Sequence, residues 1–288
     1  MKNLVIVESP SKAKTIEKYL GKGYKVMATV GHVIDLPKNK LSVDIEHSYQ
    51  PEFTTIRGKG TIIKKLKKEL PTAKQGKVYL AMDPDREGEA IAWHVSQALK
   101  LTKPKRIVFH EITKSAVQEA LEHPRDLNKD LVDAQIARRV LDRLVGYKVS
   151  ELVWRKIWYG LSAGRVQSVA LRLIVEREQE IENFKPQEYW DISADAGNKS
   201  VSFISQLINI SGKKAKVKNA DEAKHIQEDL KGKSLKVSGI SKKRVSKSPY
   251  PPFTTSTMQQ SANNRYGFTA KRTMGLAQAL YQAGYITY

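Results

Sequence analysis

The chain has 288 residues, no cysteine and a formal net charge of +20 at neutral pH. The absence of cysteine excludes disulfides, zinc–thiolate sites and thiol nucleophiles, and no apolar run approaches the roughly 18 residues that a membrane-spanning helix needs. A positive charge of this size attracts polyanions, of which nucleic acid is the commonest; with no signal peptide at its start, the chain is expected to be soluble, cytoplasmic and without a membrane partner.

Residues 1–123 alternate strand and helix patterns. Apolar and β-branched runs predict strands at residues 4–7, 24–30, 77–82 and 106–109. Amphipathic segments with capping residues predict helices at residues 11–20, 61–70, 89–99 and 114–122. Such alternation is typical of a parallel, Rossmann-like sheet with helices on both faces. Residues 37–60 are too irregular to assign.

The rest of the chain changes from helical to β-type patterns and back. Residues 131–145 carry an apolar stripe at helical spacing, and Gly146 is expected to end that helix. Further helices are predicted at residues 150–158, 166–182, 255–266 and 270–283. Alternating β-type sequence at residues 189–205 and 235–245 predicts a small β-rich module.

These patterns predict a multidomain protein of the α/β plus α class. An α/β domain is followed by a partial helical domain, a partial β-rich arm and the start of a further helical domain, at residues 1–123, 124–185, 186–248 and 249–288. The final residues look like the opening of a strand. We therefore expect the chain to be a truncated piece of a longer protein.

Acidic side chains cluster directly after the strand expected at residues 77–82. Asp83 and Asp85 are two residues apart, so on an extended strand end they point the same way, and Glu87 joins them from the turn. Carboxylates held this closely repel one another unless a cation lies between them, and Mg²⁺ is the usual cation. A solvated acidic helix N-terminus, which the helix dipole favours, explains these three residues equally well.

Glu8 follows the first predicted strand and lies beside a helix start that carries Lys12 and Lys14. Taken alone, it would be an ordinary capping residue. Because the carboxyl ends of parallel strands share one edge of the sheet, we expect Glu8 and Asp83 to lie close together. Close carboxylates push their proton affinities apart, so one acid can bind a metal while the other transfers a proton.

Six motifs follow one another along the chain: VIVESPSKAK at residues 5–14, VGHVIDLP at 30–37, DPDREGE at 83–89, GLSAGRVQS at 160–168, PFTTST at 252–257 and LYQAGYITY at 280–288. Taken in this order, they resemble the type IA DNA topoisomerases, and most closely the bacterial topoisomerase I members of that family. The first three motifs resemble the Toprim domain of the family. The resemblance spans the whole chain. It implies that the α/β domain is of the Toprim type and that the last part begins a tyrosine-bearing domain.

The resemblance implies an enzyme that breaks one strand of partly unpaired, negatively supercoiled DNA, passes a strand through the break and reseals it without a nucleotide triphosphate. Tyr288, otherwise a plain aromatic core residue, matches the nucleophile that forms a 5′-phosphotyrosine bond. Glu8 would give or relay a proton to the leaving 3′-oxygen, and Lys12 would offset the charge on the scissile phosphate. The residues implied for Mg²⁺ binding are Glu8, Asp83, Asp85 and Glu87.

The resemblance also implies a path for single-stranded DNA. His32, which by itself would be a turn histidine, would contact DNA close to the cleavage site. The other residues implied for DNA binding are Arg138, Arg139, Asp142, Arg143, Lys148, Arg155, Ser162, Ala163, Gly164, Arg165, Val166 and Gln167. From spacing alone, Arg138 and Asp142 would form a surface salt bridge. Trp154 and Trp158 offer stacking faces for unpaired bases, although a core position is the simpler interpretation.

Other functions remain open at this point. A Toprim nuclease or primase would use the same carboxylates without Tyr288, and a non-catalytic DNA-binding scaffold would need neither. The segment GLSAG at residues 160–164 also fits the nucleophile elbow of serine hydrolases, which requires a preceding strand and a late histidine. If the topoisomerase resemblance holds, we expect a monomer. A chain that ends at Tyr288 is expected to bind single-stranded DNA without being fully active alone.

Overall fold

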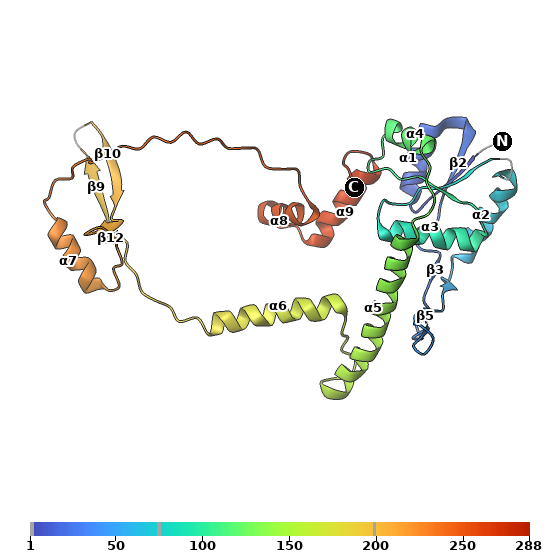
Figure 1. Cartoon of the computed structure of the whole chain (residues 1–288), viewed down its shortest axis with the longest axis horizontal. Coiled ribbons are helices and arrows are strands. Elements are labelled where there is room, and N and C mark those ends of the chain that lie inside the picture. Colours follow the sequence, from blue (N-terminus) through green and yellow to red (C-terminus); the bar gives the residue numbers. More distant parts are fainter. Residues whose placement is uncertain (1–2, 74–75, 198–199) are drawn as a thin grey trace. The chain divides into compact units, whose positions relative to one another are not determined.

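The computed structural model describes residues 3–73, 76–197 and 200–288 (Figure 1). The chain separates into two compact units. The first comprises Met1–Ala170 and Pro252–Tyr288, and the second comprises Leu171–Pro251. Within the described residues, no helix combines the length and the apolar character needed to cross a membrane.

The described part of the first unit contains a four-stranded parallel sheet, as the alternating pattern predicts. In spatial order its strands are β2 (Tyr24–Ala28), β1 (Asn3–Val7), β7 (Val78–Leu80) and β8 (Lys105–Arg106). β1 pairs with β2 on one side and with β7 on the other, so the direction of strand addition reverses between β1 and β7. Sheets of this kind bind ligands at that switch point, beyond the carboxyl ends of the strands.

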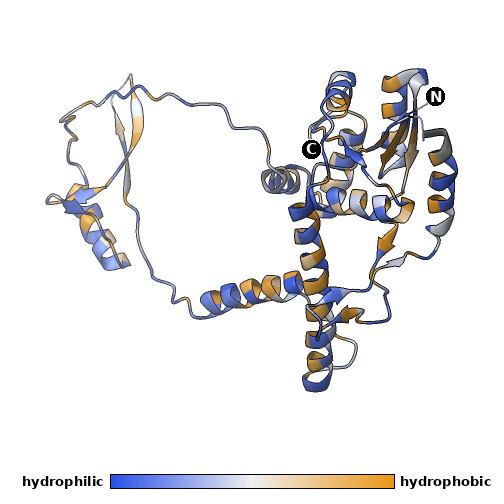
Figure 2. Ribbon diagram, turned by 45° about the vertical axis from the view of Figure 1, so that its right-hand side comes forward, coloured by the Kyte–Doolittle hydropathy of each residue, from blue (hydrophilic) through white to orange (hydrophobic). Residues whose placement is uncertain are grey.

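Helices cover both faces of this sheet, as predicted (Figure 1). They are α1 (Pro10–Leu20), which continues into the 3₁₀ turn Gly21–Gly23, α2 (Gly60–Ala73), α3 (Arg86–Leu99) and α4 (Lys114–Glu122). Side chains alternate along β1, so Leu4 and Ile6 pack with α2 and α3. Val5 and Val7 pack with α1 and α4 on the other face. Figure 2 shows the resulting concentration of hydrophobic residues in these strands.

The irregular segment between β2 and α2 forms two short antiparallel ladders. In one, β3 (Ile34–Asp35) pairs with β6 (Thr54–Thr55), and in the other, β4 (Val43–Asp44) pairs with β5 (Gln50–Pro51). Leu36, Val43 and Val140 form a small core beside these ladders. The segment is therefore packed against the helix that carries Val140.

The two helices predicted on either side of Gly146 are one continuous helix, α5 (Lys129–Lys156). The expectation that Gly146 ends a helix is therefore wrong. A glycine inside a helix costs only about 1 kcal/mol relative to alanine, and contacts on both sides of Gly146 hold α5 in place. Arg143 and Tyr147 donate hydrogen bonds of 2.6 and 2.5 Å to backbone carbonyl oxygens of the loop that precedes β4.

The last helices of the chain belong to the first unit. They are α8 (Thr255–Tyr266) and α9 (Ala270–Gln282), and both agree with the predicted helices. Thr254 begins α8 with a capping box. Tyr281, near the end of α9, is buried in the same core cluster as Val5 and Val7. The end of the chain is therefore packed against the helices on one face of the sheet.

α6 (Arg165–Glu182) begins in the first unit and ends in the second. The described part of the second unit contains two hairpins and one helix. They are β9 (Ser193–Gly197) with β10 (Ser202–Gln206), β11 (Asn209–Ile210) with β12 (Lys213–Lys214), and α7 (Ala220–Leu230). The hairpins agree with the predicted β-rich module, whereas the sequence analysis missed α7.

The strand predicted at residues 235–245 is wrong, because these residues, all of which the structure describes, form no regular secondary structure. Leu235, Val237 and Ile240 are exposed. Gly239 occupies the position where the alternation of apolar residues at 235 and 237 would require the next apolar side chain. The segment therefore has no continuous apolar face to bury, and no described strand pairs with it.

Candidate active site

The candidate active site lies at the carboxyl edge of the sheet, where the neighbouring strands β1 and β7 end. Lys12, in the first turn of α1, is almost completely buried and forms ion pairs with both Glu8 and Asp83. The structure therefore brings the two acids together at the switch point, as expected. An ammonium group between two carboxylates offsets their mutual repulsion.

The start of α1 determines where Lys12 lies. Ser9 caps the helix by accepting a 3.2 Å hydrogen bond from the backbone N–H of Lys12, and Pro10 occupies the first helical turn. Glu8 directly precedes the capping residue Ser9, and its side chain reaches Lys12 in the first turn of the helix. The sequence Glu-Ser-Pro-Ser-Lys thus places the carboxylate of Glu8 beside the ammonium group of Lys12.

Glu8 has a strongly perturbed proton affinity. Burial raises the pKa of Glu8 to about 7; the Lys12 ammonium opposes this rise, and the Asp83 carboxylate adds to it. The second carboxyl oxygen of Glu8, Oε2, is buried without a hydrogen-bond partner among the described residues. A carboxyl group that is half protonated near neutral pH is suited to transfer a proton in either direction.

Asp85 joins the site from the N-terminus of α3. Its Oδ1 accepts a 2.7 Å hydrogen bond from the backbone N–H of Gly88 and so caps the helix. A side chain at position 88 would collide with the backbone of Asp83, so the motif requires glycine there. The tight turn places Asp83 and Asp85 at the same end of the sheet.

Glu87 points to a different partner. Its carboxylate shares a 2.9 Å hydrogen bond with Nε2 of His32. Val30 and Gly31 both have left-handed backbone angles, with φ values of 58° and 81°, and this turn carries His32 toward Glu87. Among the described residues, no three His, Cys, Asp or Glu side chains are grouped closely enough to hold a metal ion by themselves.

Tyr288 lies in the site. Its phenol donates a hydrogen bond to Oδ2 of Asp85, and its backbone N–H donates one of 2.8 Å to the carbonyl oxygen of His110. Burial raises the pKa of Tyr288, and the hydrogen bond and charge of Asp85 add to this effect. The phenol is therefore protonated at neutral pH, and an acceptor for its proton is in contact with it.

Tyr281, which sequence reasoning missed, lies between Lys12 and Tyr288. The Lys12 ammonium is 5.0 Å from the centre of the Tyr281 ring, and the Tyr281 and Tyr288 rings are 5.2 Å apart, edge to face. Burial raises the pKa of Tyr281, which stays protonated. The buried aromatic ring thus supports both neighbours. In the sequence, its helical spacing from Ala277 in α9 is the feature that points to burial of Tyr281.

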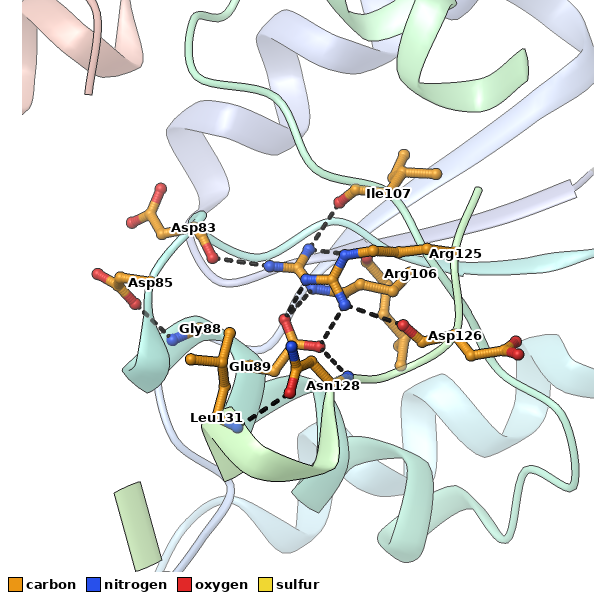
Figure 3. A network of polar contacts seen from close by, with 11 residues as sticks. Asp83, Asp85, Gly88, Glu89, Arg106, Ile107, Arg125, Asp126, Asn128 and Leu131 are labelled. Atoms are coloured by element: carbon orange, nitrogen blue, oxygen red, sulfur yellow. Dashed lines mark hydrogen bonds and ion pairs between the residues drawn. The ribbon is translucent and has the colours of Figure 1, made fainter. Parts of the chain in front are cut away.

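A second charged cluster lies behind the acidic loop (Figure 3). Arg106, which is fully buried, donates through Nε to Glu89 at 3.0 Å and through Nη2 to the backbone carbonyl oxygen of Asp83 at 2.7 Å. Arg125 adds two hydrogen bonds of 2.8 Å to Glu89, and the N–H of Asn128 adds one of 2.7 Å. The cluster ties the Asp83 backbone to the start of α5.

Sequence reasoning missed this cluster as well. Burial would raise the pKa of Glu89, but the hydrogen bonds from Arg125, Asn128 and Arg106 outweigh it and lower the pKa. Glu89 is therefore ionised and paired, which a buried carboxylate requires. An arginine directly before an apolar run, as Arg106 is before Ile107, is the signal that points to such a pair.

The basic residues predicted on α5 contact acidic and backbone oxygens. Arg139 forms a forked ion pair with Asp35. Asp142 lies 2.8 Å from Arg165 and 3.8 Å from Arg138, so the predicted salt bridge between Arg138 and Asp142 is present. The remaining predicted α5 residues are Arg143, bonded to backbone carbonyls, Arg155, paired with Glu151, and Lys148, which is exposed.

The predicted DNA-path loop follows α5. Ser150 on α5 exchanges hydrogen bonds with the backbone of Ala163, at 3.0 and 3.3 Å, and so anchors the loop. Ser162 and Gly164 are exposed or half-exposed in this loop. Arg165, Val166 and Gln167 are exposed as well, but they form the first turn of α6, so the loop ends earlier than expected. Because a helix precedes this loop, the serine-hydrolase alternative, which needs a strand there, is contradicted. Trp154 and Trp158 are exposed, so the core interpretation of these rings is wrong.

Two protein family models and a solved structure match this chain. The DNA topoisomerase family model matches residues 126–288, and the Toprim domain model matches residues 3–112. The structure of full-length topoisomerase I from Thermotoga maritima is 42% identical in sequence to this chain, with a TM-score of 0.81. The match covers 99% of this chain and 48% of that protein, so the chain spans about half the length of this relative. The chain belongs to the type IA DNA topoisomerases.

Proposed function

We propose that the protein breaks and rejoins single DNA strands through Tyr288 and so relaxes negatively supercoiled DNA as a monomer. The observation that supports this proposal is the contact of the Tyr288 phenol with Asp85, in a site that also holds Glu8 and Lys12. A phosphotyrosine bond retains the energy of the phosphodiester, so rejoining needs no nucleotide triphosphate.

The proposed reaction is a transesterification at one phosphodiester bond of the DNA. The phenol oxygen of Tyr288 attacks the scissile phosphorus, its bond to the 5′-side phosphate forms, and the bond from phosphorus to the 3′-oxygen breaks. Asp85, which accepts the phenol hydrogen bond, takes the proton. Glu8, whose pKa is raised to about 7 by burial, gives a proton to the leaving 3′-oxygen. Rejoining runs the same steps in reverse.

We assign Lys12 an electrostatic role in this reaction. Its ammonium is buried between Glu8 and Asp83, and it has no other acidic partner among the described residues. A fixed positive charge close to the scissile phosphate offsets the negative charge that builds in the transition state. The ring of Tyr281 holds the lysine in place from the other side.

The donor chemistry of the site suits Mg²⁺, a hard cation that oxygen ligands hold. Mg²⁺ usually takes one or two carboxylates from a protein and its other ligands from water and phosphate, so a group of three acids is not required. Asp83 would be the direct ligand, with Asp85, Glu87 and the unpartnered oxygen of Glu8 beside it. When bound, the cation would offset charge on the scissile phosphate.

Single-stranded DNA would reach this site along α5 and the loop that follows it. DNA phosphates would compete with Asp35 for Arg139 and with Asp142 for Arg165. His32 lies near the acidic edge of the sheet, where it contacts Glu87. The exposed rings of Trp154 and Trp158 offer stacking surfaces for bases. Binding of this kind weakens as salt rises, because DNA releases counterions.

A trapping experiment tests the proposed function. The full-length protein is mixed with single-stranded DNA labelled at its 3′ end and then denatured, and label attached to protein is measured. We expect a covalent adduct for the wild type and none for Tyr288→Phe. Cleavage that persists in Tyr288→Phe would instead indicate a nuclease. If neither the wild type nor any variant forms an adduct, and Asp83→Ala binds single-stranded DNA as tightly as the wild type, the protein would be a DNA-binding scaffold.

A further inference from the structure

A small pocket lies next to His32 in the first unit and leaves about 20 Å³ accessible to a water-sized sphere. That volume is close to the roughly 10–15 Å³ that one bound water requires. The side chains that line it are His32, Asp35, Phe53, Ala90, His94, Gln135, Ile136 and Arg139. The pocket therefore has room for a water molecule.

The buried end of this pocket carries polar atoms that need partners. Neither ring nitrogen of His94 has a hydrogen-bond partner among the residues that the structure describes, and the same is true of Oε1 of Gln135. His94 is only 6% exposed, on the inner face of α3. Buried polar atoms in folded proteins are almost always paired with protein or ordered water.

The aromatic neighbours of His94 form no hydrogen bond with it in the part of the chain that the structure describes. The rings of Phe53 and Trp93 pack at 4.7 and 4.9 Å from the imidazole, centre to centre. Burial lowers the pKa of His94 to about 4, and the nearby His32 contributes to this shift. The ring is thus neutral at physiological pH, with one N–H donor and one acceptor nitrogen.

We propose that this pocket binds one ordered water molecule, which bridges a ring nitrogen of His94 and Oε1 of Gln135. The water can donate to Gln135 while it donates to or accepts from His94. This arrangement gives a partner to one ring nitrogen of His94 and to Oε1 of Gln135. The apolar side chains of Ala90, Phe53 and Ile136 close the remaining walls.

The water site would also position the residues at the exposed end of the pocket. Asp35 and Arg139 form an ion pair there, and His32 bonds Glu87. This second part of the inference rests on the proposed function, in which Arg139 and His32 contact DNA. His94 and Gln135 would be positioning residues, because they act through the side chains in front of them.

A crystal structure of the full-length protein, at a resolution that shows ordered waters, tests the site directly. We expect a water peak within hydrogen-bond distance of His94 and of Oε1 of Gln135. Density without such a peak, or with the His94 nitrogens bonded to protein groups, overturns the proposal. This readout uses the wild type, so it does not depend on how variants fold.

Affinity for single-stranded DNA tests the positioning role. His94→Phe and Gln135→Leu are each expected to weaken binding of single-stranded DNA at least about twofold. A change of about this size is near the lower end of the coupling between side chains in one hydrogen-bond network. Gln97→Leu, an exposed change on the same helix as His94, should leave affinity unchanged. Equal affinity of all variants overturns the positioning role. If the wild type fails to bind DNA, the proposed function fails, and the water peak alone decides the site.

Discussion

Glu8 and Glu89 lie near the same edge of the sheet, yet their surroundings are opposite. Glu89 accepts hydrogen bonds from Arg106, Arg125 and a backbone N–H, and these donors lower its pKa in spite of burial. Glu8 shares Lys12 with Asp83 and keeps one oxygen unpartnered among the described residues, and burial raises its pKa to about 7. Complete pairing makes a carboxylate a structural anchor, whereas incomplete pairing leaves it able to exchange a proton.

The largest expected effect comes from breaking the anchor. Glu89→Ala leaves the guanidinium of Arg106 buried without its carboxylate, and loss of one partner of a buried pair costs about 3–5 kcal/mol. Denaturant unfolding of the full-length protein, read by a probe in the Toprim domain, measures this loss of stability.

Glu8→Ala is the matched control for that measurement. It leaves Lys12 paired with Asp83 and removes a carboxyl group whose ionisation burial opposes, so we expect a loss below about 1 kcal/mol. Similar losses for the two variants would mean that the contrast between anchor and proton donor is wrong.

His94 extends the comparison to a buried base. Its pKa is lowered to about 4 by burial, from an ordinary value of 6.5, so the unfolded chain binds a proton in this window and the folded chain does not. Stability should therefore fall as pH drops from about 6.5 to about 4, by up to roughly 3 kcal/mol. Urea unfolding at several pH values, compared with His94→Phe, measures this. Parallel pH profiles for the two proteins would contradict it.

A substitution at Val30 tests whether the backbone turn beside Glu8 is strained. The left-handed φ of 58° is costly for a β-branched residue, and the adjacent N–H of Gly31 bonds the carbonyl oxygen of Glu8 at 2.9 Å. We expect Val30→Gly to stabilise the protein by about 0.5–1 kcal/mol in thermal unfolding. Val149→Gly, inside helix α5, is the control and should destabilise by a few tenths of a kcal/mol, the approximate difference in helix propensity between valine and glycine. Destabilisation by Val30→Gly would show that the turn carries no strain.

Arg155 represents the fully exposed extreme. Its pair with Glu151 on the surface of α5 should contribute less than about 0.5 kcal/mol to stability. If Arg155 contacts a phosphate, Arg155→Ala should also reduce the slope of log affinity for single-stranded DNA against log salt by roughly 0.7. An unchanged slope would remove Arg155 from the proposed DNA path, whatever the stability result.

Much of the site was predictable from the sequence because its residues follow strand ends within short motifs. Glu8 after β1 and Asp83 after β7 meet because parallel strands place their carboxyl ends at one edge. A local signal also agrees with α9, since Gly284 follows the end of that helix. Local signals failed at Gly146, where contacts of Arg143 and Tyr147 with a distant loop override a helix-ending residue.

The parallel sheet, its helices and the acids at its edge could be predicted from the sequence, because periodicity and capping act over a few residues. Which charges are paired depends on the packing of distant segments. Arg106 meets Glu89, Tyr288 meets Asp85 and His94 meets a polar pocket only after distant segments pack. Burial, which sets the proton affinities of these groups, depends on every element that covers them, and no local pattern of residues records it.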